Sequence, residues 1–426
     1  MKNGDTNDHR LLRSIKLENL LSFGPEGARL ELGNLNILVG PNGSGKSNLI
    51  EALSLLRATP VSRDSNMDLP GVIRRGGGPA EWIWKGDKQS SGSVEVTVKA
   101  PTRGQALRHA FCFRGNEQSF RLADERIGNT DESRFFFQFR DGHPVVSTSR
   151  RPYFLREIKQ RLSILAQLRD PDQYPEITYL AEAYETIRIY REWAFGRNTV
   201  FREPQRADMR SDRLEEDFSN LGLILSRLRK TPKVTTAILD SLKDLYEGVS
   251  GFEVIVEGGS VQIFFNEGDF SLPATRLSDG TLRYLCLLAI LCDPEPAPLI
   301  CIEETELGLH PDVLPKLADL LVLASERTQL IVTTHSDILV DAMTERPEAI
   351  VVCEKHDGKT VMRRLRKEDL AGWLGQYRLG QLWTKGQIGG TRWCAQRSTW
   401  RRTKRIRCLP NFVRTRRILD RRLTAD

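Results

Sequence analysis

The sequence predicts an α/β fold with a mostly parallel sheet and covering helices. Near the N-terminus, the apolar run Leu35–Val39 ends in a glycine-rich turn, and Asn48–Arg57 then carries apolar residues at helical spacing. Toward the C-terminus, helical patterns and apolar runs alternate: helix Thr281–Leu291, strand Leu299–Ile302, helix Asp312–Ala324 and strand Gln329–Thr333. Strands that alternate with helices are typical of parallel sheets.

The pattern along the chain predicts five segments. Residues 1–10 are predicted to be disordered. Residues 11–150 are predicted to form a first lobe with an antiparallel sheet, because Gly and Asp separate the strand-like segments Val94–Lys99, His109–Arg114 and Phe135–Phe139. Residues 151–250 have helical spacing interrupted by prolines, which predicts a helical insertion. Residues 251–393 begin with the predicted strands Phe252–Val256 and Val261–Phe265 and form a second lobe, and residues 394–426 are an Arg-rich tail predicted to be disordered.

The composition excludes several classes of protein. Hydrophobic residues make up 39% of the 426 residues and charged residues 28%, as in ordinary globular proteins. No apolar run approaches the roughly 20 residues of a membrane span, and polar Met1–Arg10 does not resemble a secretory signal. The seven cysteines form no CxxC pair, which indicates thiols in a reducing compartment rather than a metal site. We therefore expect a cytoplasmic protein without membrane association.

The net charge of +7 comes from the tail alone. Residues 394–426 contain eleven Arg or Lys and two Asp, a balance of +9, so the other 393 residues carry 52 basic and 54 acidic side chains, or −2. Such a tail is typical of a flexible arm that binds nucleic acid, and equally of an extension that selection has not shaped.

The turn after the first apolar run has the composition of a phosphate-binding loop. Residues Gly40, Pro41, Asn42, Gly43, Ser44, Gly45, Lys46 and Ser47 match G-x-x-x-x-G-K-[ST], with a strand before and a helix beginning near Asn48 after. Backbone amides and the helix N-terminus would hold the phosphates of ATP. Lys46 would reach the β- and γ-phosphates, and the Ser47 hydroxyl would bind Mg²⁺.

Two later strands end in polar clusters that suit the same chemistry. Leu299–Ile302 is followed by Glu303, predicted to coordinate Mg²⁺, and by Glu304, predicted to polarise the attacking water. The next apolar run is followed by His335, which could hydrogen-bond the γ-phosphate or that water. At the start of another helix, Ser278 or Asp279 is predicted to be the N-cap, and the Ser278 hydroxyl and Gly280 amide are predicted to bind phosphate.

These four motifs, in this order, resemble the SMC/RecF-like group of ABC-class ATPases, which includes predicted AAA-family ATPases and the ATPase domain of OLD-type proteins. The resemblance covers roughly residues 11–393 and is carried by the run Leu35–Asn48, by Leu277–Thr281 as signature, by Leu299–Glu304 as Walker B and by His335 as switch histidine. It implies an ABC-type head with an antiparallel subdomain, and a homodimer in which Ser278 and Gly280 of one copy close on ATP held by the other. Glu303 in place of an aspartate and Asp279 in place of a glycine depart from the transporter pattern.

The sequence supports three hypotheses about what the ATPase serves. The first is an ATP-driven switch on DNA, in repair or in defence against foreign DNA, with contacts from the tail or from Arg202, Arg206, Arg210 and Arg213; interleaved acids favour a solvated face for these arginines instead. The second is a transporter subunit, which the lack of a membrane span and of L-S-G-G-Q disfavours. The third is an OLD-type nuclease system. Only 72 residues follow Glu354, without a D-x-D cluster, so a nuclease or TOPRIM activity would come from a separate subunit. For the adenine ring, Phe23 is the candidate stacking residue.

Overall fold

The computed structural model describes most of the chain up to residue 390. The described residues are 8–62, 66–86, 91–100, 105–116, 119–140, 143–147, 152–155, 158–194, 196, 199 and 202–390. The tail predicted at 394–426, and residues 1–7 of the predicted disordered N-terminus, lie outside them.

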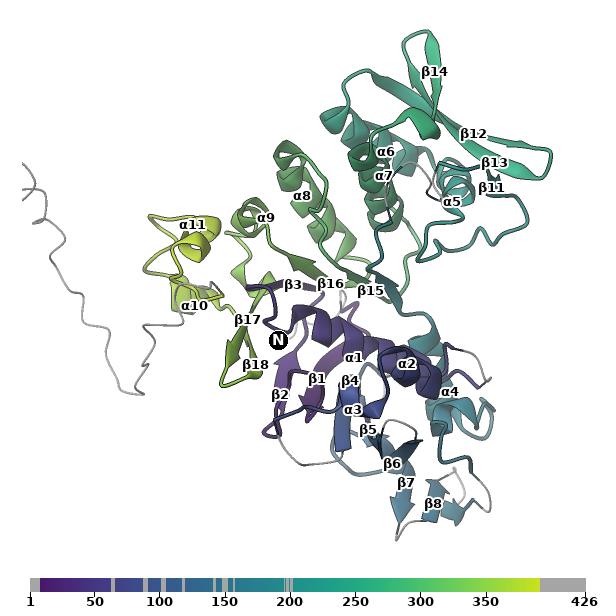
Figure 1. The fold of residues 1–426 in the computed structure, drawn as a ribbon, viewed down its shortest axis with the longest axis vertical. Coiled ribbons are helices and arrows are strands. Elements are labelled where there is room, and N and C mark those ends of the chain that lie inside the picture. The colour runs from purple at the N-terminus through teal and green to yellow at the C-terminus, as the bar shows by residue number, and fades with distance from the viewer. Residues whose placement is uncertain are drawn as a thin grey trace, which may run out of the picture.

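A six-stranded sheet forms the centre of the molecule (Figure 1). In spatial order its described strands are β10 (Arg188–Tyr190), β15 (Leu299–Ile302), β16 (Gln329–Thr334), β3 (Leu35–Val39), β17 (Ile350–His356) and β18 (Lys359–Arg364). All neighbours run parallel except β17 and β18. The predicted α/β fold with a mostly parallel sheet is confirmed.

Alternate side chains of the central strands point into two different cores. On β3, Ile37 and Val39 contribute to one cluster of buried residues and Leu38 to the other. The first core is closed by helices α5 to α9 and α11, and the second by α1, α2, α4 and the antiparallel sheet. A parallel sheet buried on both faces explains why β3, β15 and β16 appear in the sequence as continuous apolar runs.

The helices begin and end close to the predicted positions where the prediction named them. Their bounds are α1 (Lys46–Ala58), α2 (Leu69–Arg75), α3 (Pro79–Trp82), α4 (Pro175–Glu185), α5 (Leu221–Leu228), α6 (Pro232–Leu245), α7 (Asp279–Leu291), α8 (Leu314–Ala324), α9 (Asp337–Ala342), α10 (Lys367–Leu370) and α11 (Leu379–Thr384). Short 3₁₀ turns occupy Ile164–Ala166, Ala274–Arg276, Pro311–Val313 and Pro347–Ala349. None of the described helices combines the length and apolarity that crossing a membrane requires.

The predicted antiparallel sheet lies below the central sheet in Figure 1. Eight described strands form it, in the order β2 (Ala28–Glu31), β1 (Leu12–Glu18), β4 (Ser91–Val98), β5 (Leu107–Asn116), β6 (Ser119–Asn129), β7 (Phe135–Arg140), β8 (His143–Ser147) and β9 (Pro152–Phe154). Strand β4 alternates strictly between half-exposed and buried residues, as expected for a sheet with one covered face. The antiparallel subdomain is confirmed.

The predicted helical insertion, residues 151–250, needs one correction. It contains α4, α5 and α6, but also β10, which pairs in parallel with β15 inside the central sheet. With only three residues, β10 is too short to show a period in the sequence. A third described sheet, at the top of Figure 1, joins this region to the second lobe; its strands are β11 (Gln205–Arg206), β12 (Val249–Glu257), β13 (Ser260–Glu267) and β14 (Phe270–Pro273).

Candidate nucleotide-binding and hydrolysis site

The phosphate loop joins β3 to α1 with backbone conformations that require glycine. Gly40 has φ +154°, and a Cβ there would lie 2.2 Å from the carbonyl oxygen of Cys353. Gly45 has φ +97°, and its Cβ would lie 2.1 Å from Oγ1 of Thr360. Both contacts are shorter than any side chain tolerates, so these glycines let the loop pack directly against β17 and β18.

Lys46 lies inside the loop. Its ammonium donates to the carbonyl oxygens of Gly40, at 2.8 Å, and Pro41, at 3.2 Å. Burial lowers the pKa of Lys46, and the carboxylates of Glu303, Glu304 and Glu306 oppose that shift. A buried cation beside a helix N-terminus is a site for phosphate.

A chain of hydrogen bonds through two hydroxyl groups holds the backbone of the phosphate loop. Asn48 Nδ2 donates to Ser22 Oγ at 2.7 Å, Ser22 and Thr360 hydroxyls lie 2.7 Å apart, and Thr360 Oγ1 donates to the carbonyl oxygen of Ser44 at 3.0 Å. Since the Thr360 proton is used on Ser44, Ser22 is the donor to Thr360. The predicted loop residue Asn48 therefore acts on the loop's backbone through β18.

Glu303 follows β15 directly and is held by β10. Its amide donates to the carbonyl oxygen of Tyr190 at 2.9 Å, and its own carbonyl oxygen accepts from the Trp193 indole at 2.9 Å. Arg191 and the Ser47 hydroxyl both favour its ionised carboxylate, and Arg191 Nε lies 3.8 Å from Oε2. Burial raises the pKa of Glu303, against the effects of Arg191 and Ser47.

The residues around Ser47 and Glu303 fit a magnesium ion. Oε1 of Glu303 is buried without a hydrogen-bond partner among the described residues, and the Ser47 hydroxyl acts on the same carboxylate. A buried carboxylate oxygen without a donor is suited to bind a cation. Mg²⁺ in nucleotide sites takes one or two protein oxygens, with water and phosphate oxygens completing the shell. A hydroxyl and one carboxylate are therefore sufficient.

Glu304 has a strained backbone that is held from two sides. Its φ is +49°, in the left-handed region that glutamate rarely adopts. Its amide donates to Thr333 Oγ1 at 2.9 Å, and the Arg283 guanidinium donates to its carbonyl oxygen. The side chain is exposed, as a residue that acts on a bound water must be.

Arg283 and Trp193 each contact one of the two acidic residues, Glu304 and Glu303. Arg283, on α7, is only 1% exposed, and its guanidinium lies 4.0 Å from the centre of the Trp193 ring. Burial lowers its pKa to about 10, and Glu306 and Glu304 oppose that shift. Trp193 contacts Glu303 and Arg283 contacts Glu304, so one stacked pair supports both acids.

His335 follows β16, on the same edge of the sheet. Its amide donates to Oε1 of Glu306 at 2.5 Å, and its ring is exposed. Burial and the charge of Lys46 lower the pKa of His335, while Glu306 and Glu304 oppose that shift. The structure thus brings Lys46, Ser47, Glu303, Glu304 and His335 to the carboxyl ends of three neighbouring strands.

The signature residues occupy a different position. Ser278 caps α7 by accepting from the Thr281 amide at 3.1 Å, and Asp279 pairs with Arg202. A Cβ on Gly280 would lie 2.7 Å from the carbonyl oxygen of Gly308. In the described chain, no hydrogen bond or ion pair joins residues 277–281 to residues 40–48.

Some sequence-based candidates are corrected and some residues are new. Phe23 is wholly buried and cannot stack on adenine. Three of the four candidate DNA-binding arginines pair with acids: Arg202 with Asp279, Arg206 with Asp208, and Arg210 with Asp212, which favours the solvated-face interpretation for the last two. Sequence reasoning missed Arg283, Trp193, Arg191, Glu306, Thr333 and Thr360. Most of them act across the fold and leave no local signal; the position of Glu306 two residues after Glu304 could have pointed to one.

Comparisons with known proteins identify the family and the fold. A family model described as "AAA domain, putative AbiEii toxin, Type IV TA system" matches residues 35–341. The OLD nuclease of Thermus scotoductus is 24% identical over 377 residues; the match covers 84% of this chain and 65% of that protein. The chain therefore spans just under two thirds of that relative's length.

Solved structures with the same fold are heads of SMC proteins. An SMC head bound to the C-winged helix domain of ScpA has a TM-score of 0.53 at 15% identity, covering 84% of this chain and 99% of its own. An SMC head with an extended coiled coil, bound to the C-terminal domain of ScpA derived from Pyrococcus furiosus, has a TM-score of 0.52 at 14% identity, covering 86% and 98%. The family match covers more than half of the chain, so the chain belongs to the AAA-domain family named above and is an SMC/RecF-like ABC-class ATPase.

Proposed function

We propose that this protein binds ATP with Mg²⁺, dimerises on it and hydrolyses it, as a switch acting on DNA in repair or in defence against foreign DNA. The observation that carries the proposal is the meeting of the phosphate loop, Glu303, Glu304 and His335 at one edge of the central sheet. A basic loop beside two carboxylates and a histidine is the arrangement that phosphoryl transfer to water needs.

Each residue has a defined task in this proposal. The loop amides and Lys46 hold the phosphates, and Ser47 and Glu303 hold Mg²⁺, which neutralises charge on the phosphate oxygens. Glu304 accepts a proton from the attacking water, and His335 donates a hydrogen bond to the γ-phosphate. Because the pKa of His335 is lowered, the ring is neutral at physiological pH and can serve as a donor through one nitrogen only.

Dimerisation follows from the signature residues. Ser278 and Gly280 lie at a helix N-terminus suited to phosphate but are not joined to the loop of their own chain. A second copy would bring them onto the ATP held by Gly40, Pro41, Asn42, Gly43, Ser44, Gly45, Lys46, Ser47 and Asn48. ATP would then close the dimer and hydrolysis would reopen it.

The DNA role and the nuclease partner are inferred from the relatives and from charge. One relative is an OLD nuclease that this chain covers only in part, so we propose that nuclease chemistry, including that of a TOPRIM type, is supplied by a separate subunit. The tail contributes +9 of charge, which favours contact with phosphates. A transporter subunit is not favoured by any observation.

The test compares wild type with Glu304→Gln. We expect the variant to lose ATP turnover by roughly 10²-fold or more, because the base is gone, while it still binds ATP. Light scattering should then find it as a dimer with ATP and Mg²⁺ and as a monomer without them. Wild-type turnover should change when duplex DNA is added at low salt.

The matched control is Glu326→Gln, an exposed glutamate after α8 that makes no contact with the site. Normal turnover in Glu304→Gln would contradict the assigned base, and a monomer under ATP would contradict the shared site. If duplex DNA changes neither the ATP turnover nor the dimer fraction, the proposed DNA switch is wrong, but the proposed ATPase activity is not contradicted.

A further inference from the structure

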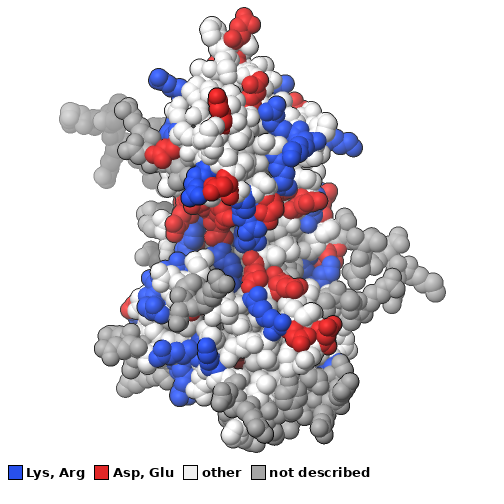
Figure 2. Space-filling model, turned by 90° about the vertical axis from the view of Figure 1, so that its right-hand side faces the viewer, with Lys and Arg blue, Asp and Glu red and all other residues white. Residues whose placement is uncertain are grey.

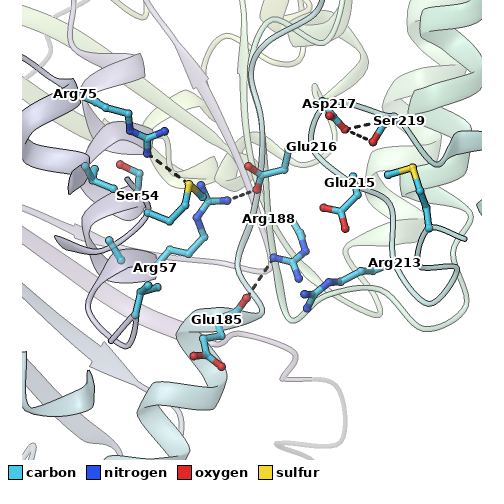
Figure 3. A pocket seen from close by; sticks show the side chains of 15 residues that line it. Ser54, Arg57, Arg75, Glu185, Arg188, Arg213, Glu215, Glu216, Asp217 and Ser219 are labelled. Carbon is cyan, nitrogen blue, oxygen red and sulfur yellow. Dashed lines mark hydrogen bonds and ion pairs between the residues drawn. The ribbon is translucent and has the colours of Figure 1, made fainter. Parts of the chain in front are cut away.

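A cavity lies between the first lobe and the helical insertion. It has a volume of about 720 Å³ and is bounded by α1, α2, the end of α4, β10 and the segment 209–219 (Figure 3). A cavity of about 550 Å³ shares Arg57, Arg75 and Glu216 with it and extends to Glu51 and Arg191. We call the two together the arginine cleft; it runs along α1 from Arg191, which contacts Glu303, to Arg213.

Acidic and basic side chains are equal in number in the larger cavity, but the acids are already engaged. Glu216 pairs with Arg57 and accepts from the Ile189 amide, and Glu185 pairs with Arg169, outside the cavity. Asp217 accepts from the amide and hydroxyl of Ser219, and Glu215 lies 3.8 Å from Arg210. Among the described residues, only the carboxylate of Glu216 is ion-paired with an arginine that lines this cavity.

Three arginines of the arginine cleft are not neutralised. Among the described residues, no carboxylate lies within 4.0 Å of Arg75, Arg188 or Arg213. Arg188 donates to backbone carbonyl oxygens of residues 185 and 187, and Arg75 contacts only the sulfur of Met67, at 3.7 Å. Nε of Arg213 is buried without a hydrogen-bond partner.

Arg188 and Arg213 are close enough to repel each other. Burial lowers the pKa of Arg188, and the charge of Arg213 lowers it further. Figure 3 shows both guanidinium groups on the same side of the cavity, with Arg57 and Arg75 across from them. Like charges kept together at a partly buried position are stabilised when an anion binds between them.

One wall of the arginine cleft is apolar. Ala58, Val61, Met67, Val72 and Met209 line it. The cleft thus offers guanidinium groups for phosphate oxygens and an apolar wall with flexible methionines for a sugar or a base. Its volume is in the range of cavities that hold a small organic ligand.

We propose that the arginine cleft binds a phosphate-bearing ligand, a nucleotide or a nucleic-acid strand, at a site separate from the phosphate loop. The phosphate lies among Arg75, Arg188 and Arg213, and the base or sugar lies on the Met67 wall. Since the cleft reaches Arg191, whose Nε lies 3.8 Å from Oε2 of Glu303, its occupant is in position to affect hydrolysis. Only the nucleic-acid source of the ligand rests on the proposed function; the nucleotide source does not.

The test uses the full chain with the phosphate loop saturated by a non-hydrolysable ATP analogue and Mg²⁺. Two probes are measured by fluorescence anisotropy: a short fluorescein-labelled single-stranded oligonucleotide and a labelled nucleoside monophosphate. Variants Arg213→Gln and Arg188→Gln should each weaken binding of whichever probe the wild-type protein binds by about tenfold. If that probe is the oligonucleotide, each should also reduce the salt slope by about 0.7.

Arg206→Gln is the matched control, because Arg206 is exposed, pairs with Asp208 and lies outside the arginine cleft. Arg213→Lys, which keeps the charge, should restore part of the affinity, and ATP turnover without probe should be unchanged in Arg213→Gln. That turnover also verifies that the variants fold.

The outcomes separate this inference from the proposed function. Arginine-dependent binding of the oligonucleotide identifies a nucleic-acid strand, and binding of the monophosphate alone identifies a nucleotide. If Arg213→Gln and Arg188→Gln both bind the oligonucleotide as tightly as wild type does, the arginine cleft is not its binding site. That outcome does not contradict the proposed DNA switch. If wild type binds neither probe, the inference is wrong. That result would have no bearing on the expected loss of ATP turnover in Glu304→Gln.

Discussion

Glu304, the proposed catalytic base, depends on contacts made by its own backbone. With φ at +49°, its main chain is in a conformation that costs about 1–3 kcal/mol for a residue other than glycine. The hydrogen bonds to Thr333 and Arg283 offset that cost. Arg283 lies on α7, the helix that follows the signature residues. The residue that positions Glu304 is therefore only five residues away in the chain from Ser278, the proposed phosphate contact.

We predict that Arg283→Met lowers kcat roughly tenfold to a hundredfold with little change in KM for ATP. The methionine keeps most of the volume but cannot donate to the Glu304 carbonyl oxygen, so the carboxylate moves away from the attacking water. Steady-state ATP hydrolysis measures both constants.

Two further variants show whether positioning is the cause. Arg283→Lys retains a donor and should recover part of kcat, while Arg327→Met removes an arginine that donates to Leu291 at the other end of α7 and should have no effect on kcat. Equal kcat in Arg283→Met and wild type would mean that Glu304 does not depend on Arg283.

At residue scale, the sequence could predict the groups proposed to contact ATP and Mg²⁺ but not the residues that support them. Lys46, Ser47 and Glu303 stand at fixed spacings because a loop or a strand end delivers them locally. Arg283 and Trp193 meet through contacts between segments about ninety residues apart, which no local pattern encodes. The same holds for Glu306, whose carboxylate accepts from His335 of the next strand.

Among the elements, the hairpin of β17 and β18 has a direct effect on the phosphate loop. Thr360, on β18, is 3% exposed and ends the hydrogen-bond chain that starts at Asn48. It contacts the loop at Ser44 and limits Gly45 to a residue without a Cβ. The loop's shape is therefore held by an element that is more than 300 residues away in the chain.

We predict that Thr360→Val raises KM for ATP severalfold and lowers the free energy of unfolding by about 1–3 kcal/mol. Valine has the same shape but leaves the Ser44 carbonyl and the Ser22 hydroxyl short of a partner. ATP titration and urea unfolding measure the two effects. The matched control is Thr97→Val, which removes a similar hydroxyl pair with Ser14 in the antiparallel sheet; if both variants change KM equally, the contact with the loop is not the cause.

Element prediction succeeded where burial makes a pattern visible. The structure gives β3 and β15 the predicted bounds, and β16 one additional residue, because a strand covered on both faces appears as an unbroken apolar run. It failed at β10, whose position is set by pairing with β15 and not by its own three residues. The boundary predicted between residues 250 and 251 therefore separates β10 from β15, its neighbour in the central sheet.

For the whole molecule, charge is distributed unevenly between body and tail. Across the middle of the face in Figure 2, basic and acidic side chains are intermixed and do not form a continuous basic surface. The balance of −2 over residues 1–393 agrees with that picture. For the proposed binding of DNA, long-range attraction would then come mainly from the charge of residues 394–426.

We predict that ending the chain at Trp393 weakens binding to duplex DNA and reduces its salt dependence, because net charge falls from +7 to −2. ATP turnover without DNA should be retained. Filter binding over a range of salt concentrations measures the change. A truncated chain that binds DNA with unchanged affinity and slope would identify the tail as a neutral extension and would place DNA contact on the body.

The strand order of the central sheet also constrains how the protein is made. β3 is complete once residue 39 has left the ribosome, but both of its neighbours, β16 and β17, belong to residues 329–356. A nascent chain must therefore keep β3 unpaired until residues 329–356 have been made, which is the high-contact-order situation that slows folding and favours aggregation. The antiparallel sheet, whose strands lie within residues 12–154, can form early and shelter it. The proposed ATP site can thus form only after β16 and β17 have been translated.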